Sequence, residues 1–168
     1  MAINQVEVEP NISNFITSLR DIGYSFDTAI ADIIDNSISA GAKIVDIFAS
    51  GKEKYVVISD NGKGMSKDEL REAMRLGSCS PFAERSGYDL GRFGLGLKTA
   101  SFSQCKKLTV ISKCHNEINA YCWDLDYLIE QNKWLLKEIS IDLFVDRDWF
   151  QFFDQYAEGT IILWENID

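Results

Sequence analysis

The fold is decided by the stretch YVVISDNGKGM, residues 55–65. Its first half is short and nearly all apolar, which is typical of a buried strand. Its second half contains Gly62 and Gly64, which let the backbone turn sharply and let a ligand approach closely. Asp60, at the end of the strand, could accept a hydrogen bond from an exocyclic amine such as that of adenine. The same D-x-G pattern is common in structural turns, so both interpretations stay open here.

Hydrophobic period and turn residues predict the elements around this strand. Helices come mainly first and strands mainly later, which favours an α+β fold rather than a doubly wound one. Ser25 is an expected N-cap, and Ser66 forms a capping box with Glu69. We expect helices over residues 11–20, 26–40, 66–76 and 147–156, a further helix ending near residue 103, and strands over residues 43–49, 55–59, 107–113, 118–126, 134–142 and 160–164.

The helix expected over residues 26–40 carries a polar face opposite its apolar side. Asp32 and Asn36 are four residues apart and therefore lie one above the other. This face is either simply solvated or a site where a carboxylate takes a proton from water beside an amide that coordinates a hard cation such as Mg²⁺. The expected apolar stripe is Phe26, Ile30, Ile33, Ile34 and Ser37, and the polar face is Asp32, Asp35, Asn36 and Ser39.

A second glycine cluster, Gly91, Gly94 and Gly96, precedes the helix that ends near residue 103. Backbone amides at a helix N-terminus favour phosphate, and Lys98 and Thr99 could add a cation and a hydroxyl. The spacing G-x-x-G-x-G is the reverse of the dinucleotide fingerprint and follows no strand, and no Walker motif occurs. The polar stretch over residues 77–91 is long for a plain connection and is a candidate functional loop. A hinge without a ligand explains these glycines equally well.

Taken in order, these pieces resemble the GHKL ATPases, which share the Bergerat nucleotide-binding fold. Residues 31–37, ADIIDNS, are similar to the N-box of that family, and residues 60–65, DNGKGM, to its D-x-G-x-G motif. Residues 91–96 resemble its lid-hinge glycines, and Gly159-Thr160 its final G-T motif. The resemblance runs from about residue 20 to residue 165. The segment GRFGLGLKT, residues 91–99, is most similar to the MORC-like branch and its bacterial HSP90-like relatives.

The resemblance implies a two-layer sandwich, with helices on one face of a mixed, largely antiparallel sheet, and ATP and Mg²⁺ as cofactors. Asp32 would be the general base, and Asn36 would hold the Mg²⁺. Asp60 would bind the adenine amino group, helped by Thr160 through water. The base pocket would be shaped by Gly62, Gly64 and Met65. The ATP lid would cover residues 77–91, and the phosphate side would be formed by Gly91, Gly94, Leu95, Gly96, Lys98 and Thr99.

Two positions depart from the pattern of this family. Asp32 stands where most members have Glu, so the shorter side chain would lie farther from the attacking water, and small displacements can cost large factors in rate. Ser39 replaces a common Asp. We therefore expect an ATPase with weak hydrolysis. The alternative is a non-hydrolysing, nucleotide-gated protein-interaction module, and a third hypothesis is a domain that has lost the nucleotide.

The length, net charge and hydropathy of the chain limit these hypotheses. Its 168 residues fit one domain, residues 1–168, which we expect to be an N-terminal fragment of a longer protein that dimerises with ATP. With 17 basic and 26 acidic residues, the net charge of −9 argues against phosphate-backbone binding by this domain, so DNA would be contacted through other regions. The sequence has no signal peptide and no apolar span, which predicts a cytoplasmic protein without a membrane partner.

The cysteines and the single histidine show no sequence pattern typical of a metal site or a catalytic nucleophile. Cys79, Cys105, Cys114 and Cys122 form no C-x-x-C pair, so we expect buried, idle thiols. His115 has no second histidine to join it and no acid held beside it in the sequence. We therefore expect neither a zinc site nor a Cys/His nucleophile at this position.

Overall fold

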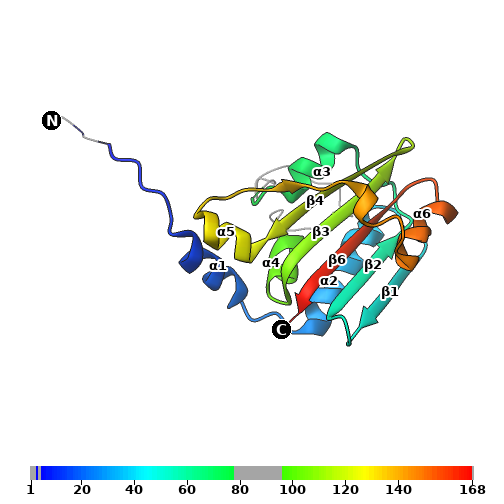
Figure 1. Ribbon diagram of the computed structural model, residues 1–168, viewed down its shortest axis with the longest axis horizontal. Coiled ribbons are helices and arrows are strands. Elements are labelled where there is room, and N and C mark those ends of the chain that lie inside the picture. The colour runs from blue at the N-terminus through cyan, green and yellow to red at the C-terminus, as the bar shows by residue number, and fades with distance from the viewer. Residues whose placement is uncertain (1–2, 4, 78–95, 168) are drawn as a thin grey trace.

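The computed structural model describes residues 3, 5–77 and 96–167 of the chain. Its helices and strands form two layers, as expected for an α+β sandwich (Figure 1). The helices are α1 Ile12–Arg20, α2 Phe26–Ser39, α3 Lys67–Met74, α4 Gly96–Phe102, α5 Leu125–Gln131 and α6 Phe152–Gln155, with 3-10 turns at Ile141–Leu143 and Asp148–Gln151. The strands are β1 Val45–Ser50, β2 Tyr55–Asp60, β3 Cys105–Cys114, β4 Glu117–Asp124, β5 Lys137–Glu138 and β6 Gly159–Ile167.

The sheet has the strand order β1-β2-β6-β3-β4-β5, and every neighbouring pair is antiparallel. It is therefore more regular than the mixed sheet that the family resemblance implied. The last strand in the sequence, β6, lies at the centre between β2 and β3. Among the described strands, the two halves of the sheet are therefore joined through β6.

The two faces of the sheet are buried by different elements, because successive side chains of a strand alternate between faces. On β6, Ile162 and Trp164 pack into the core beneath the helices, whereas Ile161 and Leu163 pack against Phe152 and the residues around it. In Figure 1, α2 and α4 lie behind the strands and the orange segment ending in α6 lies before them. Any functional group on an even-numbered position of β6 therefore faces the helices.

The capping residues predicted from the sequence begin helices α2 and α3. The Ser25 hydroxyl accepts a hydrogen bond from the Thr28 amide at 3.2 Å, and Ser66 forms the expected capping box with Glu69. The buried stripe along helix α2 is narrower than the apolar stripe that the sequence predicts. Its buried members are Ala29, Ile33 and Ser37, while Phe26 is 45% exposed at the helix start.

The region after β4 differs from the sequence expectation. The strand expected over residues 118–126 ends at Asp124, and residues 125–131 form a helix, α5, because the Asp124 carboxylate accepts from the Tyr127 amide at 3.2 Å and caps its start. The strand expected over residues 134–142 is reduced to β5 and a 3-10 turn. Apolar periodicity alone does not separate short helices from strands.

The described residues test two further expectations, the burial of the cysteines and the absence of a membrane-spanning helix. Cys105, Cys114 and Cys122 are buried, as expected, and Cys79 lies outside the described residues. Within residues 3, 5–77 and 96–167, no helix is long and apolar enough to cross a bilayer.

Candidate functional site

A row of three polar side chains crosses the helix-covered face of the sheet. Asp60 of β2 pairs with Thr160 of β6, and Thr160 pairs with Ser112 of β3. Each of them continues an alternate series of buried apolar residues on its strand, and all three are buried beneath the helices. Polar groups at core positions are retained where they are hydrogen-bonded or bind something, so this row is the centre of the candidate site.

The Asp60 carboxylate is buried, at 5% exposure, and is held from two sides. Its Oδ2 accepts from the Ser37 hydroxyl at 2.9 Å, and its Oδ1 accepts from the Gly62 amide at 2.9 Å. Burial raises the pKa of Asp60 above its ordinary value, against the opposing effect of the hydrogen bonds from Gly62, Ser37 and Thr160. A carboxylate oxygen has room for more than one donor, so Asp60 can still accept from a ligand amine.

A dense hydrogen-bond network surrounds the other two members of the row. The Ser112 hydroxyl lies 3.1 Å from Thr160 Oγ1 and donates to the Gly159 carbonyl at 3.1 Å. It also accepts from the Met65 amide at 2.9 Å. Ser112 thus ties the loop after β2 to the start of β6, across strands that are far apart in sequence.

The loop after Asp60 is shaped by close packing. Gly64 has φ +62°, and a Cβ at this position would lie 2.0 Å from the Lys113 carbonyl oxygen. A Cβ on Gly159 would lie 2.2 Å from the Asp60 carbonyl oxygen. The Asn61 side chain accepts from the amides of Lys43 and Ile44 at 2.8 and 2.9 Å. The glycines therefore allow the backbone to pack closely, and the turn is fixed without any ligand.

The polar face of α2 is divided into two parts. Asp32 and Asn36 are half-buried, whereas Asp35 and Ser39 are exposed. The Tyr24 phenol interacts with the Asp32 carboxylate and with Thr99 of α4. Burial, followed by the interaction with Asp32 and the charge of its carboxylate, raises the pKa of Tyr24. On this polar face, Asp32 and Asn36 are therefore the two residues that are partly covered by neighbouring elements.

Residues at the start of α4 are buried rather than extended toward solvent. The Lys98 side chain is 2% exposed, and its Nζ donates to the carbonyls of Ala73 and Arg75 at 2.6 and 2.7 Å. These carbonyls end α3, where a cation is favourable. The Thr99 hydroxyl lies 3.5 Å from the Gly96 carbonyl oxygen. Contact of Lys98 and Thr99 with phosphate stays a prediction, and Gly91, Gly94 and Leu95 lie outside the described residues.

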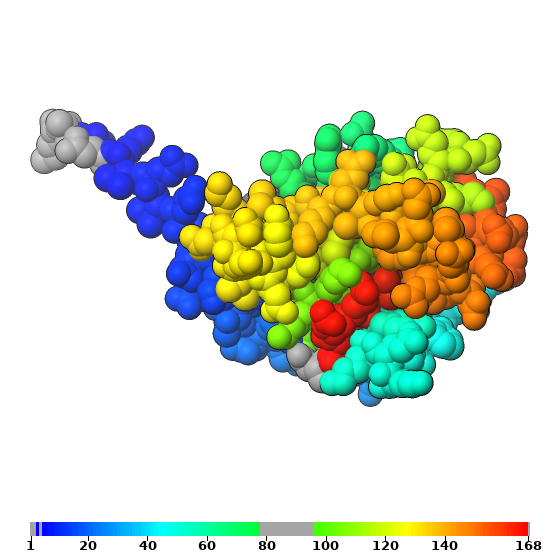
Figure 2. Space-filling view, in the orientation of Figure 1, coloured from blue at the N-terminus to red at the C-terminus, as the bar shows by residue number. Residues whose placement is uncertain are grey.

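Two surface hollows lie on the other face of the sheet. Their volumes are about 520 and 490 Å³, and both are lined by Tyr55, Arg147 and Trp149. Figure 2 shows this face, where the orange segment lies beside the red strand β6. Because neither hollow is lined by Asp60, Ser112 or Thr160, neither belongs to the polar row.

Sequence reasoning missed three residues of this site as functional residues. Ser37 was visible as a serine within an apolar helix stripe, which is a signal for a buried hydrogen bond. Ser112 reaches Thr160, and Tyr24 reaches Thr99, across segments far apart in the chain. No local pattern could identify these two.

The chain matches the family described as "Histidine kinase-, DNA gyrase B-, and HSP90-like ATPase" over residues 24–160. It is 30% identical over 95 residues to ATPase morc-1 of Caenorhabditis elegans, covering 55% of this chain and 11% of that protein. It is 33% identical over 97 residues to the DNA mismatch repair protein MutL of Shewanella sediminis, covering 56% and 16%. For MutL of Halobacterium salinarum the identity is 32% over 92 residues, covering 53% and 14%.

The chain spans less than a fifth of the length of these relatives. The family match, by contrast, extends from Tyr24, which contacts Asp32, to Thr160 in the polar row. It therefore includes every described residue of the site and most of the two-layer fold. The chain belongs to the histidine kinase-, DNA gyrase B- and HSP90-like ATPases, the GHKL family, as an ATP-binding domain.

Proposed function

We propose that this domain binds ATP together with Mg²⁺, hydrolyses it slowly, and uses the nucleotide to close a lid and to dimerise within a larger protein. The observation that carries the proposal is the buried Asp60 carboxylate, held by Ser37 and Gly62 in a row with Thr160. A buried carboxylate of this kind is costly unless donors satisfy it. An adenine amine would be one such donor.

The base end of the site would work by preorganisation. Asp60 would accept from the adenine amino group, and Thr160 would assist through water. Gly62, Gly64 and Met65 would form the wall of the base pocket. Because the loop is already fixed by Asn61 and Ser112, little ordering would be required when the base binds.

The phosphate end would be built on α2. An amide oxygen from Asn36 beside a carboxylate from Asp32 is a donor set that suits a hard cation, so these residues fit Mg²⁺. Asn36 would hold the ion, which neutralises phosphate charge when bound. Asp32 would accept the proton of the attacking water. The Tyr24 phenol would orient the Asp32 carboxylate for this task.

The role of the larger protein is proposed from its relatives. MutL is named a DNA mismatch repair protein, so we propose that the ATP cycle of the full-length protein serves DNA handling. The acidic charge of this domain, −9, makes regions outside it the DNA-binding part. We propose a cytoplasmic location for the protein.

Two measurements on the same preparation test the proposal. Calorimetry with ATP and Mg²⁺ should give saturable heat, and phosphate release should be slow but measurable. Asp32→Ala should lower phosphate release by about 100-fold or more with ATP affinity retained. Asp35→Ala is the matched control, because Asp35 lies on the same helix but is exposed.

The outcomes separate the rival functions. Equal phosphate release by wild type and Asp32→Ala, with normal ATP binding, would favour the non-hydrolysing interaction module. The absence of binding heat at millimolar ATP would contradict the nucleotide-dependent proposals and favour a domain that has lost its ligand. Binding that is equally tight without Mg²⁺ would contradict the role given to Asn36.

A further inference from the structure

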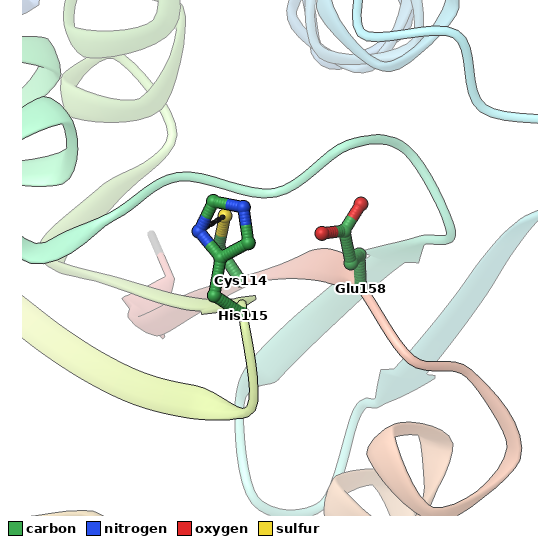
Figure 3. Close-up of side chains that lie close together, drawn as sticks. All are labelled: Cys114, His115 and Glu158. Atoms are coloured by element: carbon green, nitrogen blue, oxygen red, sulfur yellow. Dashed lines mark hydrogen bonds between the residues drawn. The ribbon is translucent and has the colours of Figure 1, made fainter.

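A second cluster of ligand-type side chains lies outside the nucleotide site. Cys114, His115 and Glu158 each offer one atom, and the three atoms all lie within 4.8 Å of one another. Figure 3 shows the three side chains together, two from the end of β3 and one from the segment before β6. The Cys114 sulfur is 3.4 Å from His115 Nδ1. The sequence separates Glu158 from the other two, so only the fold reveals the group.

The hairpin between β3 and β4 explains how neighbouring residues converge. Cys114 pairs with Glu117, which leaves His115 and Asn116 as a two-residue turn. Both turn residues have positive φ, at 51° and 62°, as in a type I′ turn. Consecutive residues of a regular strand would point to opposite faces, whereas the left-handed turn brings His115 back toward the Cys114 sulfur.

The sheet pairing brings in the third side chain. Lys113 of β3 pairs with Gly159, the first residue of β6, so Glu158 just before β6 lies next to Cys114. The backbone here is closely packed, since Gly64 touches the Lys113 carbonyl. The three groups are therefore held by a rigid hairpin and strand start, while His115 remains exposed and Glu158 half-buried.

The local charge suits a cation. The carboxylates of Glu158, Glu69 and Glu117 all lie close enough to act on the Cys114 sulfur through their charge. A metal ion would offset the repulsion among these acidic groups.

We propose that Cys114, His115 and Glu158 form a zinc-binding site at the β3–β4 hairpin. Thiolate, imidazole and carboxylate are the three ligand types of protein zinc, and three protein ligands leave a fourth position for water or a ligand. Small rotations of His115 and Glu158, which are not buried, would bring the ligand atoms to coordination distance. This site is independent of the Mg²⁺ proposed at Asn36, and the expectation of no zinc at His115 is thereby replaced.

Cobalt substitution of the metal-free chain tests this directly. Titration of the chelator-treated protein with Co²⁺, without nucleotide, should saturate at a single equivalent. It should give the thiolate charge-transfer absorption and the visible bands of a tetrahedral ion, and Zn²⁺ should abolish both. No saturable absorption in the wild type would overturn the proposal.

Variants identify the ligands. Cys114→Ser should remove the charge-transfer band. His115→Asn keeps a residue that tolerates the left-handed turn, and Glu158→Gln keeps the shape, so both should fold and bind at least about 10-fold more weakly. Cys122→Ser is the matched control and should keep the wild-type spectrum, because Cys122 is a buried cysteine outside the cluster. A band that survives Cys114→Ser, or that disappears in Cys122→Ser, would contradict the assignment.

Discussion

Two aspartates, placed at opposite ends of the proposed nucleotide site, have very different surroundings. Asp60 is buried at the end of β2 and receives hydrogen bonds from Ser37 and from the Gly62 amide. Asp32 is half-buried on α2 and interacts with the Tyr24 phenol. The same type of side chain is thus fixed at the proposed base end and more accessible at the proposed phosphate end.

The difference indicates how binding and hydrolysis divide between the two ends. A rigid, desolvated carboxylate discriminates well between donors and acceptors but exchanges protons slowly with solvent. A half-exposed carboxylate can accept a proton from water but needs another group to orient it. We therefore expect changes at the base end to alter stability and affinity, and changes at the phosphate end to alter rate.

The largest expected effect tests the rigidity of the base end. Gly64→Ala should destabilise the domain by about 3 kcal/mol, because it combines a left-handed φ with a Cβ 2.0 Å from the Lys113 carbonyl oxygen. Gly41→Ala is the control, since Gly41 has φ +79° but no atom within 4 Å of the added Cβ. It should cost only about 1 kcal/mol. Urea unfolding measures both, and equal losses would mean that packing at Gly64 is unimportant.

The next effect concerns ATP affinity. Asp60→Asn should weaken ATP binding by about 30-fold, or about 2 kcal/mol, because the amide presents a donor where adenine and Gly62 also donate. Calorimetry with Mg²⁺-ATP measures the change, and circular dichroism checks that the variant is folded. Asp46→Asn, at an exposed position on β1, should bind like the wild type. An unchanged affinity in Asp60→Asn would remove Asp60 from the base pocket.

The third effect is a pH dependence of stability. Burial raises the pKa of Asp60, so the folded state holds this proton over a pH range in which the unfolded chain has lost it. Stability from this group is present below its ordinary pKa and is lost as pH rises through the raised value, at no more than about 1.4 kcal/mol per pH unit. Urea unfolding across acidic pH should show this slope in the wild type and not in Asp60→Asn. Parallel curves would contradict the buried carboxylate.

The smallest effect tests the phosphate end. Tyr24→Phe keeps the ring but removes the hydroxyl that we propose to orient Asp32, so phosphate release should fall by about threefold, under about 1 kcal/mol. The change should appear in kcat and leave KM for ATP unchanged, which a general loss of structure would not do. Tyr127→Phe, on α5, serves as the control. A shift in KM alone would place Tyr24 in binding rather than in positioning.

The sequence was sufficient for features that depend on local chemistry. The capping residues Ser25 and Ser66 and the strand leading to Asp60 are as predicted, because each is determined by its immediate neighbours. The α+β class also followed from the order of the elements. The expected strand over residues 118–126 ran two residues into α5, and the helix itself was not expected, because its apolar residues fit both periods.

Features that depend on pairing between distant segments could not be predicted. The placement of β6 between β2 and β3 brings Ser112 beside Thr160, and nothing near either residue indicates it. The same pairing brings Glu158 to Cys114. A single sequence contains the side chains of both groups but not the register that joins them.

The indole of Trp164 offers an optical view of the helix layer. Its Nε1 donates to Ser101 Oγ of α4 at 2.8 Å, and its ring lies edge-on to Phe26 of α2, with centroids 6.1 Å apart. The side chain is fully buried at the centre of the sheet. A shift of α4 or α2 against β6 would change the hydrogen bond and polarity around this indole, and therefore its emission wavelength. Because the chain has four tryptophans, a variant that keeps only Trp164 can report movement of the helices that carry Thr99 and Asp32 through its native fluorescence.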